Sequence, residues 1–173
     1  MDEIIKKSES IDLTGDNVRN ICEGEVEIVP YHTLGQYSSI ENLLEKHGAV
    51  ILLYETRENF GHYVALFYNK DGDLEFFDSY GFKPDQELKY ATFNLNNGKP
   101  FLTLLLEKYN KKLIVNTKRL QIFLKDINTC GRWTSLRVRF RKKYNLREFI
   151  HLTMDNKNYN GDFWVSALTY LLI

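Results

Sequence analysis

The feature of the sequence that most constrains the fold is an apolar run followed by a marked hairpin. The run covers residues 49–54 and contains no charged residue, which is typical of a strand buried on both faces. Residues 61–68 and 74–78 form two further strand patterns. The turn between them contains Asp71-Gly72, a dipeptide typical of tight hairpins. We therefore expect a sheet with a buried central strand and a hairpin.

The rest of the chain alternates predicted helices with short strands. Spacing and capping residues indicate helices over about 14–22, 38–48, 100–111, 130–144, 146–152 and 162–172, and strands over 26–30, 113–115 and 120–123. Helices interspersed with an explicit hairpin predict an α+β fold. The length of 173 residues predicts a single domain, 1–173, that can bury a core.

Composition argues against several classes of protein. Lys+Arg and Asp+Glu both number 23, so the net charge indicates no nucleic-acid or membrane partner. Cys22 and Cys130 do not make a disulfide framework, which favours a reducing compartment. Neither a signal peptide nor a bilayer-spanning run is evident, so we expect no secretion and no membrane insertion. Because His32, His47 and His151 lack ligand-like spacing, we predict no metal site.

Cys130 stands where a helix is predicted to begin. Asp126, Asn128 and Thr129 precede it and are capping residue types. A thiol in a first helical turn meets unpaired N–H groups and the positive end of the helix dipole, and both favour the thiolate. Cys130 is therefore a candidate nucleophile, and the alternative is a small buried hydrophobic residue at a helix start.

Three other residues could complete a nucleophilic site. His62 begins one hairpin strand and Asp78 ends the other, so the turn brings both to the same end of the ribbon, where Asp78 could orient the imidazole. Their contact depends on a register that the sequence does not fix. Gln121 could donate a hydrogen bond to the oxygen that becomes negative when a thiolate attacks a carbonyl. Considered one at a time, His62 could instead be a structural histidine, Asp78 a turn-initiating aspartate and Gln121 a solvated polar residue.

The order of these residues resembles a known protease family. The motifs are Gly61-His62-Tyr63-Val64-Ala65-Leu66, Phe77-Asp78-Ser79-Tyr80-Gly81, Gln121 and Asn128-Thr129-Cys130-Gly131. The order His, Asp, Gln, Cys is similar to that of adenovirus-type (adenain-like) maturation cysteine proteases and of the related deconjugases of ubiquitin-like proteins. It differs from papain-like enzymes, in which Cys precedes His. The similarity is closest to the branch found in virophages, Polinton-type elements and large DNA viruses. Two positions depart from the pattern: Tyr63 stands where relatives often have tryptophan, and Gln121 lies farther upstream of the cysteine than usual.

The resemblance implies an adenain-like variant of the papain-like fold, with a mixed central sheet flanked by helices and the nucleophile at a helix N-terminus. Cys130 would be the nucleophile, His62 its general base and Asp78 the residue that orients His62. Gln121 and the backbone N–H of Cys130 would stabilise the oxyanion. The implied activity is a cysteine endopeptidase that processes capsid and other virion precursor proteins during maturation. We expect a monomer that acts in the virion or at a cytoplasmic or nuclear assembly site in the host cell, with no cofactor apart from a possible DNA or peptide activator.

Two other functions stay open. A deconjugase of ubiquitin-like modifiers would use the same chemistry but would need a surface that docks a folded modifier. A catalytically inactive scaffold would not require an intact His62, Asp78 and Cys130.

The segment after Cys130 is rich in basic residues. These are Arg132, Arg137, Arg139, Arg141, Lys142, Lys143 and Arg147. Because they go around the predicted helix, they favour a solvated face, and the alternative is an electrostatic contact with viral DNA.

Overall fold

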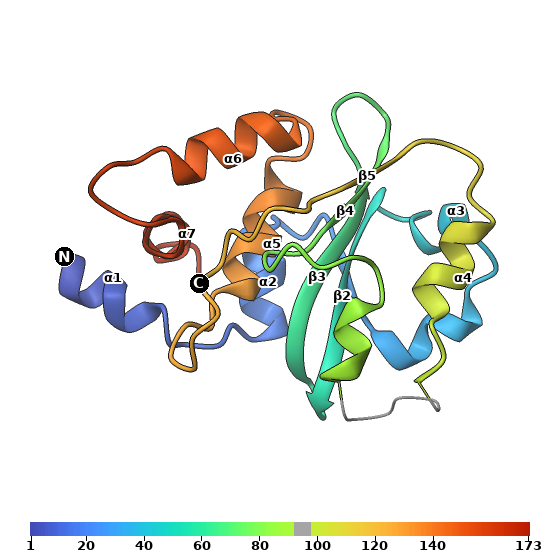
Figure 1. Cartoon of the computed structure of the whole chain (residues 1–173), viewed down its shortest axis with the longest axis horizontal. Coiled ribbons are helices and arrows are strands. Elements are labelled where there is room, and N and C mark those ends of the chain that lie inside the picture. The colour runs from blue at the N-terminus through green and yellow to red at the C-terminus, as the bar shows by residue number, and fades with distance from the viewer. Residues whose placement is uncertain (92–97) are drawn as a thin grey trace.

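The computed structural model describes residues 1–91 and 98–173. At its centre is a five-stranded mixed sheet whose strands lie side by side in chain order (Figure 1). The strands are β1 Glu27–Pro30, β2 Ala49–Arg57, β3 Phe60–Tyr68, β4 Leu74–Phe77 and β5 Leu113–Val115. β3 is antiparallel to both of its neighbours, β2 and β4, whereas β1 and β5 pair in parallel at the two edges. The predicted α+β class and the predicted hairpin are both confirmed.

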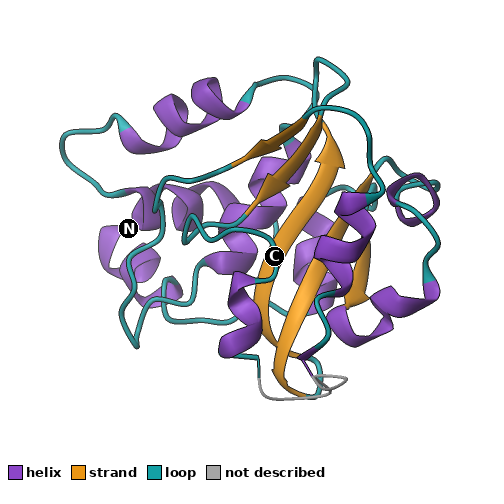
Figure 2. Ribbon diagram, turned by 45° about the vertical axis from the view of Figure 1, so that its right-hand side comes forward, coloured by secondary structure: helices purple, strands orange, loops and turns teal. Residues whose placement is uncertain are grey.

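Helices cover both faces of this sheet (Figure 2). The helices on one side are α1 Asp2–Ser8, α2 Gly15–Ile21, α5 Cys130–Arg139, α6 Leu146–Met154 and α7 Gly161–Thr169. On the other side lie the 3-10 helix η1 Tyr31–Gln36 and the helices α3 Ile40–Leu43 and α4 Phe101–Glu107, and a second 3-10 helix, η2 Gln86–Lys89, follows β4. Among residues 1–91 and 98–173, no helix is both long enough and apolar enough to cross a bilayer.

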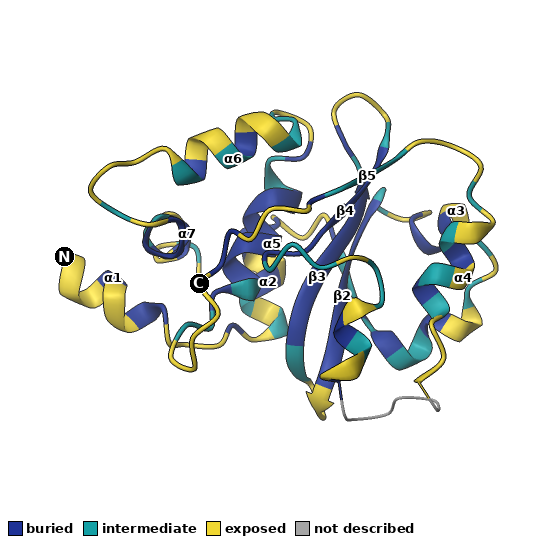
Figure 3. Ribbon diagram, viewed as in Figure 1, coloured by how far each residue is buried: buried dark blue, intermediate teal, exposed yellow. Residues whose placement is uncertain are grey.

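The sheet separates two hydrophobic clusters, and β2 contributes to both. Ile51 and Leu53 pack into the cluster on the α5 side, whereas Val50 and Leu52 pack into the cluster on the side of η1, α3 and α4. Successive side chains of a strand point to opposite faces, so a strand with two covered faces must be apolar throughout. This explains the uninterrupted apolar run, and Figure 3 shows the central strands as almost entirely buried.

Strand β3 pairs with β4 over fewer residues than it pairs with β2. β3 pairs with β4 only from Ala65 to Tyr68, because β4 ends at Phe77. On its other side β3 stays paired with β2 as far as Phe60. Residues 60–64 of β3 therefore have an edge that β4 does not cover, and the polar residues described below gather at this edge.

Helix α5 is a central helix, and the prediction of a solvated basic face is wrong for much of it. Arg132 and Arg137 are fully buried. Arg137 forms two hydrogen bonds of 2.8 Å with Glu75 of β4, and both side chains are 0% exposed. Arg132 donates to Thr169 and to the Ser8 carbonyl. Sequence spacing showed where these cations lie around the helix. It did not show that Arg132 would hydrogen-bond to Thr169 of α7 or that Arg137 would pair with the buried Glu75 of β4.

Several boundaries also differ from the sequence predictions. The strand predicted at 120–123 is absent, because the N–H groups of Leu120 and Gln121 both donate to the Ser79 carbonyl and form no ladder. The helices predicted at 38–48 and 100–111 are shorter, Ile40–Leu43 and Phe101–Glu107. Helix α1 and both 3-10 helices were not predicted.

Candidate active site

His62 lies on β3 at the edge that β4 leaves open. It pairs with Tyr54 of β2, and its side chain is buried. The preceding Gly61 is required by packing, because a Cβ there would lie 1.9 Å from the Tyr54 carbonyl oxygen. The glycine lets β2 approach closely, which fixes the backbone beside the imidazole.

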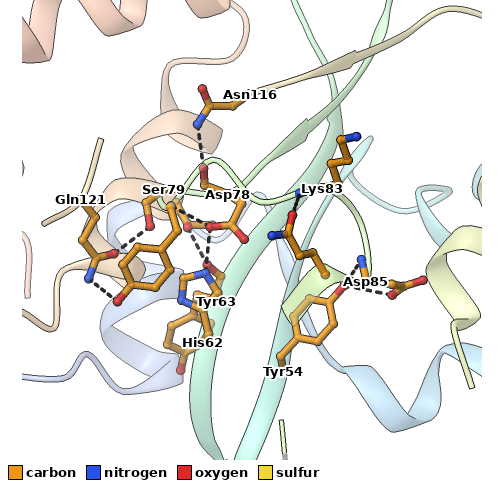
Figure 4. A network of polar contacts seen from close by, with 12 residues as sticks. Tyr54, His62, Tyr63, Asp78, Ser79, Lys83, Asp85, Asn116 and Gln121 are labelled. Carbon is orange, nitrogen blue, oxygen red and sulfur yellow. Dashed lines mark hydrogen bonds and ion pairs between the residues drawn. The ribbon is translucent and has the colours of Figure 1, made fainter. Parts of the chain in front are cut away.

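Asp78 is the first residue after β4, and it holds the imidazole. Its Oδ1 lies 2.9 Å from Nε2 of His62, so the contact predicted from the hairpin is present (Figure 4). The Tyr80 N–H also donates to Oδ1, over 2.8 Å, and Asn116 donates to the Asp78 carbonyl. Because Nε2 faces the carboxylate, Nδ1 is the nitrogen left for the thiol.

Cys130 begins helix α5 and is half-buried, and its thiol lies close enough to the His62 imidazole to raise the pKa of that ring. By strand alternation His62 belongs to the sheet face of Val64, whereas α5 packs on the opposite face with Tyr63. The two side chains can meet because the sheet ends there, at the uncovered edge of β3. Thr134 of α5 donates to the Tyr63 carbonyl over 3.1 Å and ties the helix to this edge.

The charge on His62 is set by its neighbours. Burial alone would lower the pKa of the imidazole, but the charge of Asp78, the hydrogen bond to Asp78 and the contact with Cys130 raise this pKa well above its ordinary value. The raised pKa favours an imidazolium beside the thiol, and an imidazolium is the partner that stabilises a thiolate.

Gln121 lies at the site but is not solvated, since it is 1% exposed. Its Nε2 donates to the Tyr80 hydroxyl over 3.2 Å and to the Ile127 carbonyl over 3.1 Å. Its Oε1 accepts from the Ser79 hydroxyl over 2.8 Å (Figure 4). Both amide hydrogens are therefore engaged within the protein, and an oxyanion role for Gln121 itself stays a prediction.

The loop that leads to Cys130 is held by Asp162 of α7, a residue that the sequence did not single out. Thr129 is the residue before the helix, but its side chain does not cap it. Instead the Thr129 hydroxyl donates to Asp162 over 2.5 Å, as do the Trp133 indole N–H over 2.8 Å and the Ile122 N–H over 2.8 Å. A carboxylate so far along the chain from the loop leaves no local sequence signal.

A cleft of about 250 Å³ opens at this edge. Its lining residues are Asp12, Thr56, Phe60, Gly61, His62, Tyr80, Glu87, Tyr90, Gln121, Phe123, Ile127, Asn128 and Cys130. A larger hollow of about 510 Å³ lies beside β1 and contains none of the predicted site residues. Chemistry rather than size therefore identifies the site.

Glu87 adds a buried acid to this cleft. The pKa of its carboxyl is raised to about 7, mainly by burial and in addition by nearby Asp78, although His62 and Lys89 oppose the rise. Its Oε2 is buried and has no hydrogen-bond partner among the described residues. No motif or spacing in the sequence singles out this residue.

His62, Asp78 and Glu87 bring potential metal-ligand atoms within 4.8 Å of one another. The imidazole is already hydrogen-bonded to Asp78, and it lies beside Cys130. A cation would have to displace one of these partners, so the geometry fits an acid–base group better than a metal centre. The absence of a metal site stays a prediction.

The second cysteine lies outside the site. Cys22 is buried at 2% exposure, and its thiol contacts the Ser135 carbonyl. Burial raises the pKa of this thiol to about 12, and Cys22 packs into the hydrophobic cluster on the α5 side of the sheet.

Comparison with known proteins gives one informative relative. No protein-family model matches the chain. The chain is 38% identical over 149 residues to the uncharacterized protein V9 of Sputnik virophage, an alignment that covers 84% of this chain and 85% of that protein. At that identity and coverage, the chain belongs to the same family as this virophage protein.

Proposed function

We propose that this protein is a cysteine endopeptidase with an adenain-like variant of the papain-like fold, and that it processes virion precursor proteins. The observations that carry the proposal are that Asp78 is hydrogen-bonded to His62, that the His62 imidazole lies beside Cys130, and that His62 and Cys130 line one cleft. A thiol, an imidazole and a carboxylate in this sequence form a nucleophile, a base and the group that orients the base.

In the proposed reaction the Cys130 thiolate attacks the carbonyl carbon of the scissile peptide. A C–S bond forms and the carbonyl electron pair moves onto oxygen. Cys130 begins α5, so its backbone N–H has no acceptor within the helix and can donate to this oxygen. The positive end of the helix dipole also favours the negative charge that develops there.

His62 then donates its proton to the amide nitrogen, the C–N bond breaks and the amine leaves an acyl-enzyme. Water attacks the thioester while the neutral imidazole accepts its proton. The C–S bond breaks, the acid product leaves, and the thiolate–imidazolium pair is restored. Asp78 keeps the imidazole oriented and supports its positive charge in both halves of the cycle.

The proposed substrate class rests on the resemblance of the site motifs to viral maturation proteases and on membership of a family with a virophage protein. A capsid precursor is the natural candidate, with the virion or the assembly site in the host cell as the place of action. A DNA activator has less support than the sequence suggested, because Arg132, Arg137 and Arg141 are buried.

The proposal is tested by incubating a capsid precursor with the wild-type chain, with Cys130→Ala and with Cys22→Ala as the matched control, each with and without DNA. We expect the wild type and Cys22→Ala to cleave the precursor and Cys130→Ala to leave it intact. If the wild type leaves the precursor intact under every condition, the maturation role is wrong. If it instead cleaves a C-terminal amide reporter of a ubiquitin-like modifier, the protein is a deconjugase.

A further inference from the structure

Tyr80 presents a phenol hydroxyl in the cleft. Its ring stacks on the His62 imidazole, with centroids 4.8 Å apart and planes inclined by 17°. The ring edge of Phe123 packs against it at 5.0 Å. Tyr80 and Cys130 line the same cleft. The tyrosine side chain is therefore held on both sides, next to the proposed nucleophile.

The hydrogen bond from Gln121 shows that the Tyr80 hydroxyl acts as an acceptor in this contact, so its own proton stays available for another acceptor. If the Gln121 amide were rotated by half a turn, its oxygen would face the Ile127 carbonyl oxygen, which is repulsive. Nε2 therefore faces both the Ile127 carbonyl and the Tyr80 hydroxyl, and the hydroxyl is the acceptor in the second contact. Among the described residues, no acceptor takes the Tyr80 O–H proton in return.

The hydroxyl keeps this proton at neutral pH. Burial raises the pKa of Tyr80 well above its ordinary value, and the negative charge of Cys130 raises it further, followed by the charges of Glu87, Asp78 and Asp162. Tyr80 is therefore a neutral donor that lies within the electrostatic field of Cys130. A preorganised donor of this kind is what a developing oxyanion requires.

We propose that Tyr80 is a catalytic residue whose O–H donates to the substrate carbonyl oxygen as that oxygen becomes negative. Gln121 then acts through Tyr80 as a positioning residue. The proposal rests on the nucleophilic role of Cys130. In this step the C–S bond forms, the carbonyl electron pair moves onto oxygen, and that oxygen accepts hydrogen bonds from Tyr80 and from the Cys130 N–H without proton transfer.

The test compares two reactions of Cys130 that differ only in whether an oxyanion forms. p-Nitrophenyl acetate acylates a thiolate through attack on a carbonyl and releases p-nitrophenolate. Iodoacetamide alkylates the same thiolate by displacement of iodide, with no oxyanion. The rates at Cys130 are measured by mass spectrometry for the wild type, Tyr80→Phe, Gln121→Ala and, as a matched control, Tyr170→Phe, an exposed tyrosine outside the cleft.

We expect Tyr80→Phe to slow acylation by at least about tenfold and to leave the alkylation rate unchanged. Gln121→Ala should slow acylation in the wild-type chain but add little in a Tyr80→Phe chain, because both variants remove one effect. Tyr170→Phe should change neither rate.

Unchanged acylation in Tyr80→Phe overturns the proposal, as does an equal loss of both rates, which would mean that Tyr80 acts on the thiolate rather than on the oxyanion. If neither reagent modifies Cys130 of the wild type, the nucleophile itself is absent. In that case the proposed function fails together with the role of Tyr80. If Tyr80→Phe folds poorly, Gln121→Ala still tests the proposal, because it leaves the ring of Tyr80 in place. An unchanged acylation rate in Gln121→Ala would then overturn it.

Discussion

Among the residues of the site, His62 is the one whose charge decides the chemistry. Burial works against the imidazolium and lowers the pKa of His62, but the effects of Asp78 and Cys130 together outweigh it. The carboxylate also fixes the orientation of the ring through Nε2. The charge of Asp78 can be removed without loss of its shape by replacement with asparagine, which separates the two effects.

We predict that Asp78→Asn lowers the pKa of His62 by about one to three pH units, because an adjacent opposite charge is lost. The titration of the ring protons is followed by NMR, with His62→Ala to assign the signal among the four histidines. An imidazole that titrates at the same pH in both chains would show that Asp78 does not set its charge.

Glu87 should make stability depend on pH. Its ordinary pKa is 4.5 and its pKa in the folded chain is about 7, so the folded chain binds this proton more tightly than the unfolded chain does. The free energy of unfolding should therefore fall as pH rises through the window between 4.5 and about 7. Glu87→Gln removes this loss, and above the window we expect the variant to be more stable than wild type by up to about 3 kcal/mol.

Urea unfolding below and above the window measures the effect of Glu87→Gln, with the exposed Glu107→Gln as control. The variant and wild type should have nearly equal stability at the acidic end. Equal stability at both ends would contradict the account of Glu87.

Among the elements, α5 and the loop before it depend on α7. Asp162 accepts hydrogen bonds from Ile122, Thr129 and Trp133, and thus links the two ends of the loop to the nucleophile helix. The role of Asp162 could not be predicted from the sequence, because its hydrogen bonds join segments that are distant along the chain and share no pattern.

We predict that Asp162→Ala lowers the free energy of unfolding by about 2–4 kcal/mol, because it leaves buried donors without an acceptor. The control is Asp126→Ala, an exposed aspartate in the same loop, which should change stability little. Guanidinium unfolding at neutral pH measures both, and similar small losses in the two variants would contradict this role of Asp162.

The elements also show where sequence reasoning succeeds. The hairpin was predictable because a buried apolar run and an Asp-Gly turn are local signals. The same turn placed His62 and Asp78 at one end of the ribbon. The strand predicted at 120–123 was wrong, because a short apolar segment becomes a strand only beside a partner, and here Ser79 takes both N–H groups. The burial of Arg132 and Arg137 was not predictable, because their partners are distant in sequence.

At the scale of the whole molecule, the site depends on a sheet that ends at different points on its two sides. Strand alternation assigns His62 and α5 to opposite faces, and an extended ladder between β3 and β4 would keep them apart. β4 ends at Phe77, so the thiol and the imidazole meet across the uncovered edge of β3. Local patterns indicated each residue, but only the termination of β4 brings the Cys130 helix to the hairpin.

The central claim is that Cys130 reacts as a thiolate because His62 is its partner, and the rate of alkylation of Cys130 by iodoacetamide tests it most directly. At about pH 6 an ordinary thiol, with a pKa of about 8.5, is almost wholly protonated. We predict that Cys130 of the wild type then reacts at least about tenfold faster than Cys130 of His62→Ala and than a cysteine peptide. Equal rates in the wild type and His62→Ala across the whole pH range would contradict the account.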